Sequence, residues 1–149
     1  MALTAPDLTQ RAPRSPRVRL GGYVILARML DKGRATVAKK NGEFYYNCPL
    51  DHRFLEFTGI NADKLKKELA KGKSDSEILV WIEKNAKHHR CPGEIHLWSK
   101  LMEDRVPSDV DGRSYFNDMV AKIAPQREDI ATWFDLLDLD DYVTFGGQP

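Results

Sequence analysis

Only two cysteines, Cys48 and Cys91, occur among the 149 residues, and these are too few for a disulfide framework. Long hydrophobic runs are also missing: the apolar stretch Tyr23–Ala27 is far shorter than the roughly 20 residues that cross a membrane. The opening MALTAPDLTQRAP lacks the apolar segment of a secretion signal. Together these features predict a soluble, cytoplasmic protein that does not bind membranes.

Sequence motifs of well-known chemistries are absent as well. GxSxG, CxxC, HExxH and GxGxxG do not occur. Lys71–Ser74 ends like a phosphate-binding loop, but Lys67 stands where that motif needs glycine. Asp109–Gly112 lacks the carboxylate spacing of a calcium loop. We therefore predict no cofactor and no bound metal, and we favour a non-catalytic binding or interaction protein over an enzyme.

The net charge of +1 conceals an uneven distribution of charge along the chain. Residues 1–40 carry +7, residues 41–107 are balanced, and residues 108–149 carry −6. Such asymmetry indicates either an acidic partner for the basic segment or two chain ends that pack together. We favour the second interpretation, in which Arg17 or Arg19 lies near an acid of the C-terminal segment, a group formed by Asp135, Asp138, Asp140 and Asp141.

The basic, proline-rich arm of residues 1–15 leads into the remaining candidate for a partner-binding site. Arg11, Arg14, Arg17 and Arg19 recur at intervals of two or three residues and could contact successive phosphates. A net charge near zero and the lack of a nucleic-acid-binding motif do not favour nucleic acid as the partner. The partner is therefore unknown, and self-association is an open alternative.

Helix start and stop signals dominate the rest of the sequence. Ser15 and Pro16 predict the cap and first position of a helix that continues past Gly33. For residues 34–47, a hairpin turned by Asn41-Gly42 competes with a helix that ends at this glycine, and we favour the helix. EFYYN is then expected to be short and extended.

Beyond residue 47 the spacing of apolar residues predicts a succession of helices. Gly59 ends the first, Asn61 caps a short lysine-rich helix, and Ser74 with Glu77 forms a capping box. Three more apolar stripes lie in residues 95–102, 115–123 and 130–137. The sequence thus predicts an all-α protein: a single compact domain over 1–149, with six or seven helices, an extended arm over 1–15 and at most one short strand or hairpin.

The histidines and cysteines gather in two short clusters, Cys48/His52 and His88/His89/Cys91. Cys48-Pro49 and Cys91-Pro92 each place cysteine at a helix cap and proline at the first helical position, with an acid two residues later. On this interpretation residues 87–90 form the last turn of the preceding helix, where cations are favoured. Helix boundaries therefore account for both clusters without any chemistry.

Two functional alternatives for these clusters are weaker. If both helix starts converged, the cysteines and histidines could form a tetrahedral metal site, although their spacing is not that of an established zinc motif. Alternatively, a helix N-terminus beside His89 and Arg90 could make Cys91 a reactive thiol. Either would make the protein a thiol- or metal-dependent enzyme or sensor.

Three long stretches carry a family resemblance: PRSPRVRLGGYVILARMLDKGRA, NCPLDHRFLEFTGI and REDIATWFDLLDLDDY. They resemble the bacterial family known as domain of unknown function 5069, over about residues 7–147. The resemblance implies a bacterial cytoplasmic protein. It implies no activity, ligand or catalytic residue, so the function stays unknown at this point.

Overall fold

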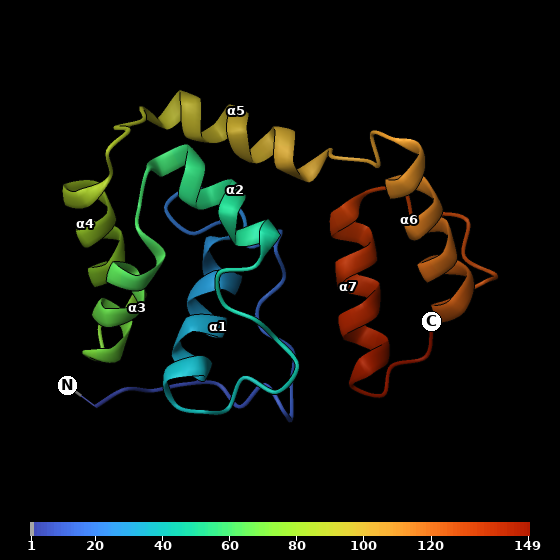
Figure 1. Ribbon diagram of the computed structural model, residues 1–149, viewed down its shortest axis with the longest axis horizontal. Helices are drawn as coiled ribbons and strands as arrows, with labels where there is room; N and C mark the ends of the chain where they lie inside the picture. The colour runs from blue at the N-terminus through green and yellow to red at the C-terminus, as the bar shows by residue number, and fades with distance from the viewer. Residues whose placement is uncertain (1) are drawn as a thin grey trace.

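Seven helices joined by irregular segments form the computed structural model, which describes residues 2–149 (Figure 1). No β-sheet occurs in this part of the chain; two residues, Leu20 and Tyr23, make an isolated antiparallel bridge. The helices are α1 (Leu26–Val37), α2 (Pro49–Thr58), α3 (Ala62–Ala70), α4 (Asp75–Asn85), α5 (Pro92–Glu103), α6 (Val110–Ile123) and α7 (Trp133–Thr144). The predicted all-α class is confirmed.

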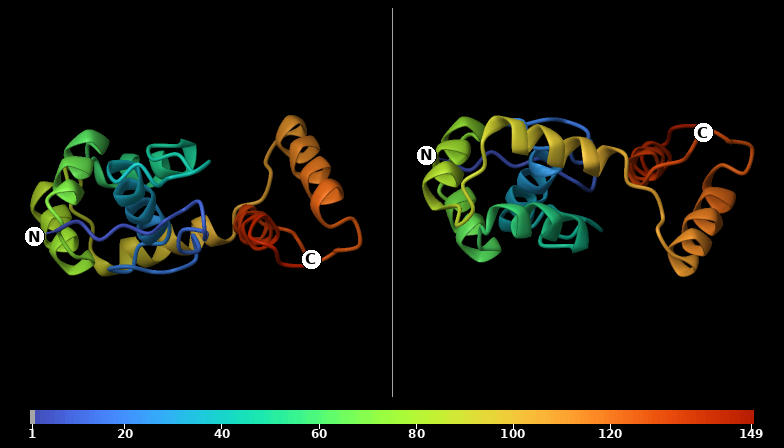
Figure 2. Two further views of the ribbon diagram at one scale, coloured as in Figure 1. Left: turned by 90° about the horizontal axis from the view of Figure 1, so that it is seen from below. Right: turned by 90° about the horizontal axis from the view of Figure 1, so that it is seen from above.

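α1 is the central helix. α3 and α4 lie on one side of it, α7 and α6 lie on the other, and α5 crosses above them (Figures 1 and 2). Nine of the twelve residues of α1 are buried. The main apolar core forms around it from α2, α3, α4, α5 and α7, with fully buried side chains such as Phe54, Leu65, Ile78 and Phe134.

Gly33 lies at a contact between α1 and α3. A Cβ atom at this position would be 2.6 Å from Leu69 Cδ1 and 3.2 Å from ring carbons of Tyr46. The glycine that weakens α1 as an isolated helix therefore makes room for α3. Its presence inside the helix has a packing reason.

Most of the predicted helix boundaries are confirmed. Cys48, Ser74 and Cys91 each occupy the cap position of a capping box, and Asn61 Oδ1 accepts a hydrogen bond from Lys64 N. Gly59 ends α2 in the left-handed conformation, with φ 71°. Between α1 and α2 there is no hairpin, as preferred, but the predicted helix end at Gly42 is wrong, because α1 ends at Val37 with Ala38 as its cap. EFYYN forms turns rather than an extended segment.

The predicted start of the first helix is wrong. α1 begins at Leu26, not at Pro16, because residues 20–23 reverse the chain direction. Leu20 and Tyr23 exchange both backbone hydrogen bonds, and Gly21 and Gly22 adopt positive φ between them. The Ser15 side chain donates to Asp138 instead of capping a helix.

The predicted last turn at residues 87–90 is also wrong. α4 ends at Asn85, and Ala86 is extended. The chain then crosses to the end of α2, where His88 N donates to the Thr58 carbonyl at 3.1 Å. Contact with another helix, rather than the dipole of α4, thus determines the position of these cationic residues.

Candidate functional site

The two Cys/His clusters lie at opposite ends of α2. Cys48 precedes the first residue of this helix, whereas His88 contacts its last residue. Ten helical residues correspond to a separation of about 15 Å. Residues 2–149 contain no group of three or more His, Cys, Asp or Glu side chains that could hold a metal ion. The structure does not bring the two clusters into one site.

Cys91 lies at a helix N-terminus, as both interpretations of this residue predict, but the Arg90 side chain contacts Phe57. Cys91 is exposed, and its N–H donates to Glu94 Oε1 at 3.2 Å. The Arg90 guanidinium lies 4.5 Å from the centre of the Phe57 ring and donates to the Phe57 carbonyl. Arg90 therefore stabilises the end of α2, and Cys91 is a helix cap.

Cys48 has a more unusual neighbour. Lys32 projects from α1 with only 3% of its surface exposed, and its Nζ lies 3.1 Å from Cys48 Sγ and 3.0 Å from Asp51 Oδ1. Asp51 is fully buried and accepts further hydrogen bonds from the backbone N–H groups of Asn47 and Cys48. A buried ion pair thus joins the central helix to the start of α2.

This ion pair lies beside a cavity of about 600 Å³. The cavity, which we call the first chamber, is bounded by α1, the segment between α1 and α2, and α7. Its lining combines apolar and charged side chains, among them Leu8, Arg28, Lys32, Phe44, Cys48, Leu50, Leu137, Asp140, Asp141 and Phe145. This mixture is typical of a small-molecule site.

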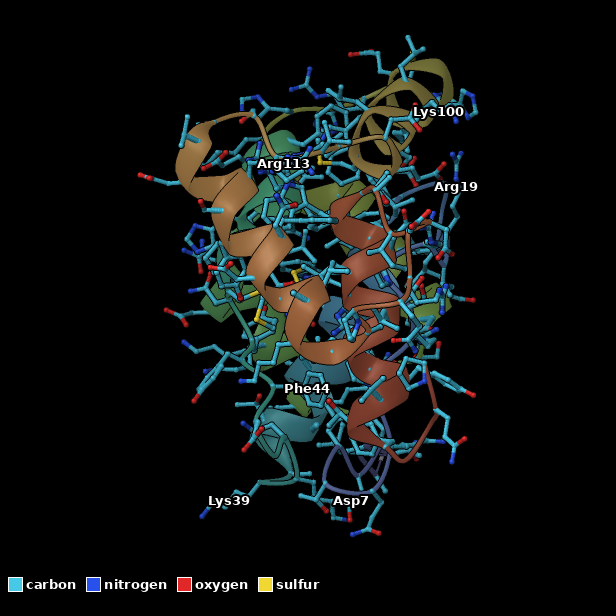
Figure 3. The ribbon with its side chains drawn as sticks, turned by 90° about the vertical axis from the view of Figure 1, so that its right-hand side faces the viewer. Asp7, Arg19, Lys39, Phe44, Lys100 and Arg113 are labelled. Atoms are coloured by element: carbon cyan, nitrogen blue, oxygen red, sulfur yellow. The ribbon has the colours of Figure 1, made fainter. Side chains whose placement is uncertain are left out.

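Two aromatic rings lie along one side of the first chamber. Phe44 and Phe145 stack with ring centres 6.3 Å apart and planes nearly parallel. Figure 3 views the molecule from the side of α6 and α7 and labels Phe44 near the ends of these helices. Arg28 lies 5.6 Å from the Phe44 ring centre, so a cation contacts the aromatic pair.

The acids of α7 that face this chamber differ in their partners. Asp141 forms an ion pair with the buried Arg28, at 2.7 Å. Asp140 has no such partner in residues 2–149, and burial raises the pKa of its carboxyl group. The neighbouring charge of Asp141 raises this pKa further, while Arg28 lowers it. Asp140 is thus a charged group of the chamber that no ion pair within residues 2–149 stabilises.

A second cavity of about 300 Å³ shares Leu50, Leu137 and Asp140 with the first chamber. This second chamber lies between α2, α6 and α7, and its remaining lining includes Arg53, Arg105, Tyr115, Met119 and Trp133. Because three lining residues are common to both, the two chambers are neighbours along α7. We call the two chambers together the α7 cleft.

The arginines proposed for partner binding mostly contact acids of the same chain. Arg17 pairs with Asp135 and Asp138 of α7, as the packing of the two chain ends predicts. Arg14 bridges Asp31 of α1 and Asp75 of α4. Arg19 pairs with Glu103 of α5, at 2.7 Å. Arg11 is exposed and forms no such ion pair within residues 2–149.

The sequence indicated Cys48 as a candidate residue, but the contact of Lys32 with Cys48 and Asp51 was not predicted. Lys32 lies 16 positions from Cys48 on another helix, and Asp51 was interpreted only as a first-turn acid. Arg53 and Arg105 were missed because nothing in the sequence links α2 to the segment after α5. Nothing in the sequence marks Lys32 as the partner of Asp51, because the two residues lie 19 positions apart on different helices.

Comparison with known proteins places these features in a family. No curated protein matches the chain. A family model described as a domain of unknown function, DUF5069, matches residues 10–143. This range includes all seven helices except the last residue of α7, and it spans every residue of the second chamber. The chain therefore belongs to the family of the domain of unknown function DUF5069, whose function is unknown.

Proposed function

We propose that this protein is a non-catalytic binding protein and that the α7 cleft is its ligand site. The observation that carries the proposal is the size and lining of the first chamber, since cavities of roughly 300–1,000 Å³ with apolar walls and a few polar groups hold small ligands. The two cations of its wall are already paired, which supports binding rather than catalysis. Arg28 is occupied by Asp141, and Lys32 by Asp51.

Ligand-induced stabilisation tests this proposal. A ligand at about 100 times its Kd stabilises a folded protein by roughly 2.7 kcal/mol, so the melting temperature of this chain should rise by about 5–10 °C. A library of small metabolites is the probe. Leu137→Trp should abolish the shifts because Leu137 faces both chambers and a larger side chain would fill the cleft.

Leu97→Trp is the matched control. Leu97 is 70% exposed on α5 and does not line the cleft, so this variant should keep the shifts of the wild type. Compounds that stabilise Leu137→Trp as strongly as the wild type would contradict the assignment of the ligand to the cleft.

Three coarser expectations accompany the proposal. No helix in residues 2–149 is long and apolar enough to span a membrane. Both cysteines are free thiols, which supports the expectation of a cytoplasmic location, where thiols stay reduced. We also expect a single domain, because the arm of residues 1–15 and the ion pairs of Arg17 connect the start of the chain to α7. One cooperative unfolding transition would support this expectation.

A further inference from the structure

Two arginines face the second chamber without an acidic partner. Arg53 lies on α2, and Arg105 follows the end of α5. Within residues 2–149 neither guanidinium has a carboxylate oxygen within 4 Å, whereas seven other arginines of this chain each contact a carboxylate. The second chamber is therefore a place where positive charge is left unneutralised.

The two charges are close enough to influence each other. Burial lowers the pKa of Arg105, and the positive charge of Arg53 lowers it further. Two like charges at the wall of one cavity cost free energy unless an anion lies between them. Such an arrangement is characteristic of sites for phosphate or carboxylate groups, which arginine binds through two parallel N–H donors.

Asp140 does not supply this anion. It also lines the second chamber, but Arg28 is the cation that lowers the pKa of its carboxyl group. Within residues 2–149 the Asp140 carboxylate forms no ion pair with Arg53 or Arg105. The arginine pair is left for a group from outside the chain.

Aromatic rings lie beside the arginine pair. Tyr115 and Trp133 line the second chamber with ring centres 6.4 Å apart and planes tilted by 32°. Tyr115 is 57% exposed, so its ring is accessible from solvent. Ring faces of this kind stack on flat ligands.

We propose that the second chamber binds a small aromatic anion, with its phosphate or carboxylate group between Arg53 and Arg105 and its ring against Tyr115 and Trp133. This inference rests on the proposed function, because it names the chemical class of ligand that the α7 cleft takes. It adds that negative charge and a flat ring are both required for tight binding.

Calorimetric titration with three probes tests the assignment: phenyl phosphate, inorganic phosphate and phenol. Phenyl phosphate carries both features, and each of the others carries one. We expect phenyl phosphate to bind at least tenfold more tightly than either of the other probes. Its affinity should fall as salt is added, because the ionic contacts are screened.

Single substitutions assign the contacts. Arg53→Gln and Arg105→Gln should each weaken phenyl phosphate binding at least tenfold, which matches the loss of hydrogen bonds to a charged group. Tyr115→Ser should weaken phenyl phosphate but leave inorganic phosphate unchanged. Lys84→Gln removes one positive charge from an exposed side chain outside the chamber and should change neither affinity.

Melting of the unliganded variants separates binding from folding. Because Arg53 and Arg105 repel each other, Arg53→Gln should melt at the same temperature as the wild type or higher, while losing the anion. Wild-type affinity in an Arg53→Gln/Arg105→Gln double variant, or no binding of phenyl phosphate by the wild type, would overturn the inference. If neutral compounds still bind in a way that Leu137→Trp abolishes, only the anion assignment falls; if none binds, the proposed function falls with it.

Discussion

α1 and α6 are helices of similar length with very different surroundings. Nine of the twelve residues of α1 are buried, and three of these are the cations Arg28, Lys32 and Arg34. α6 has fourteen residues, of which only Phe116 is buried. Both helices carry charged residues on several sides, so their composition alone does not explain the difference.

Acids on other helices allow the three cations of α1 to be buried together with its apolar residues. Lys32 pairs with Asp51 of α2, Arg34 with Asp75 of α4, and Arg28 with Asp141 of α7. The charges of α6 receive no comparable set of partners within residues 2–149. A helix with several charges can therefore be central if its neighbours supply the opposite charges. Four substitutions test the surroundings of the two helices, from the largest expected effect to the smallest.

Lys32→Met should have the largest effect. It leaves the fully buried Asp51 without its cation, and breaking a buried ion pair in this way costs about 3–5 kcal/mol. The loss should lie near the lower value because two backbone N–H groups still donate to Asp51. Lys122→Met on the exposed side of α6 is the control, and chemical denaturation of both variants measures the contrast.

If Lys32→Met and Lys122→Met lower the free energy of unfolding by the same small amount, the proposed difference between α1 and α6 is wrong. This result would mean that the Lys32 pair contributes no more than an exposed charge, for which changes within about 0.5 kcal/mol are usual.

Phe116→Ala probes the one buried residue of α6. The Phe116 ring packs edge-to-face on Trp133, at 5.3 Å, and lies outside the main core. Truncation of a buried phenylalanine costs about 3–5 kcal/mol, and we expect a value of about 3 kcal/mol or less here because the surroundings are partly open. Hydrogen exchange should accelerate in α6 and α7 while α1 stays protected. Uniform acceleration across all helices would instead indicate that α6 is part of the main core.

Gly33→Ala tests the close contact between α1 and α3. An added methyl group usually stabilises a helix by roughly 0.5–1 kcal/mol. Here it would meet Leu69 and the Tyr46 ring, so we expect a net loss of about 1–3 kcal/mol. Ser114→Ala, on the exposed surface of α6, should be neutral or slightly stabilising in the same thermal melts. A stabilised Gly33→Ala variant would show that α3 can move away at little cost.

Asp140→Asn should have the smallest effect, and in the opposite direction. Burial raises the pKa of this carboxyl group in the folded protein, so folding loses stability as the pH rises from the unfolded pKa through the folded one. At pH 7 the free energy of unfolding of the asparagine variant should therefore exceed that of the wild type. The gain should be at most about 1 kcal/mol, because the Asp140 side chain is only partly buried. This gain should vanish near pH 3, where both states of the wild type are protonated. A gain that is independent of pH would contradict the electrostatic explanation.

Local features of the fold were predictable because local residues determine them. Ser74 with Glu77, Asn61 and Gly59 fix helix ends through contacts within four residues, and these predictions are confirmed. The start of α1 was missed for a related reason. The signal at Ser15-Pro16 was read without the opposing turn at Gly21-Gly22, which reverses the chain before a helix can form.

The candidate site was much less predictable. Arg14 and Asp75 are 61 positions apart, and Arg53 and Arg105 lie on separate parts of the chain. No periodicity in the sequence links such residues, because their proximity depends on how the helices pack. The charge asymmetry was informative because the opposite net charges of the two chain ends are both large. It correctly predicted the contact of Arg17 with α7.

The contact between the start of the chain and α7 has a consequence for biosynthesis. The hydrogen bond from Ser15 to Asp138 joins positions 123 residues apart, and Arg28 reaches Asp141 over 113. At a translation rate of about 5–20 residues per second, Asp138 and Asp141 are synthesised roughly 6–25 s after their partners Ser15 and Arg28. During that interval the nascent chain cannot bury Arg28 with its partner, so the final docking of α1 occurs only after the ribosome has made the last helix.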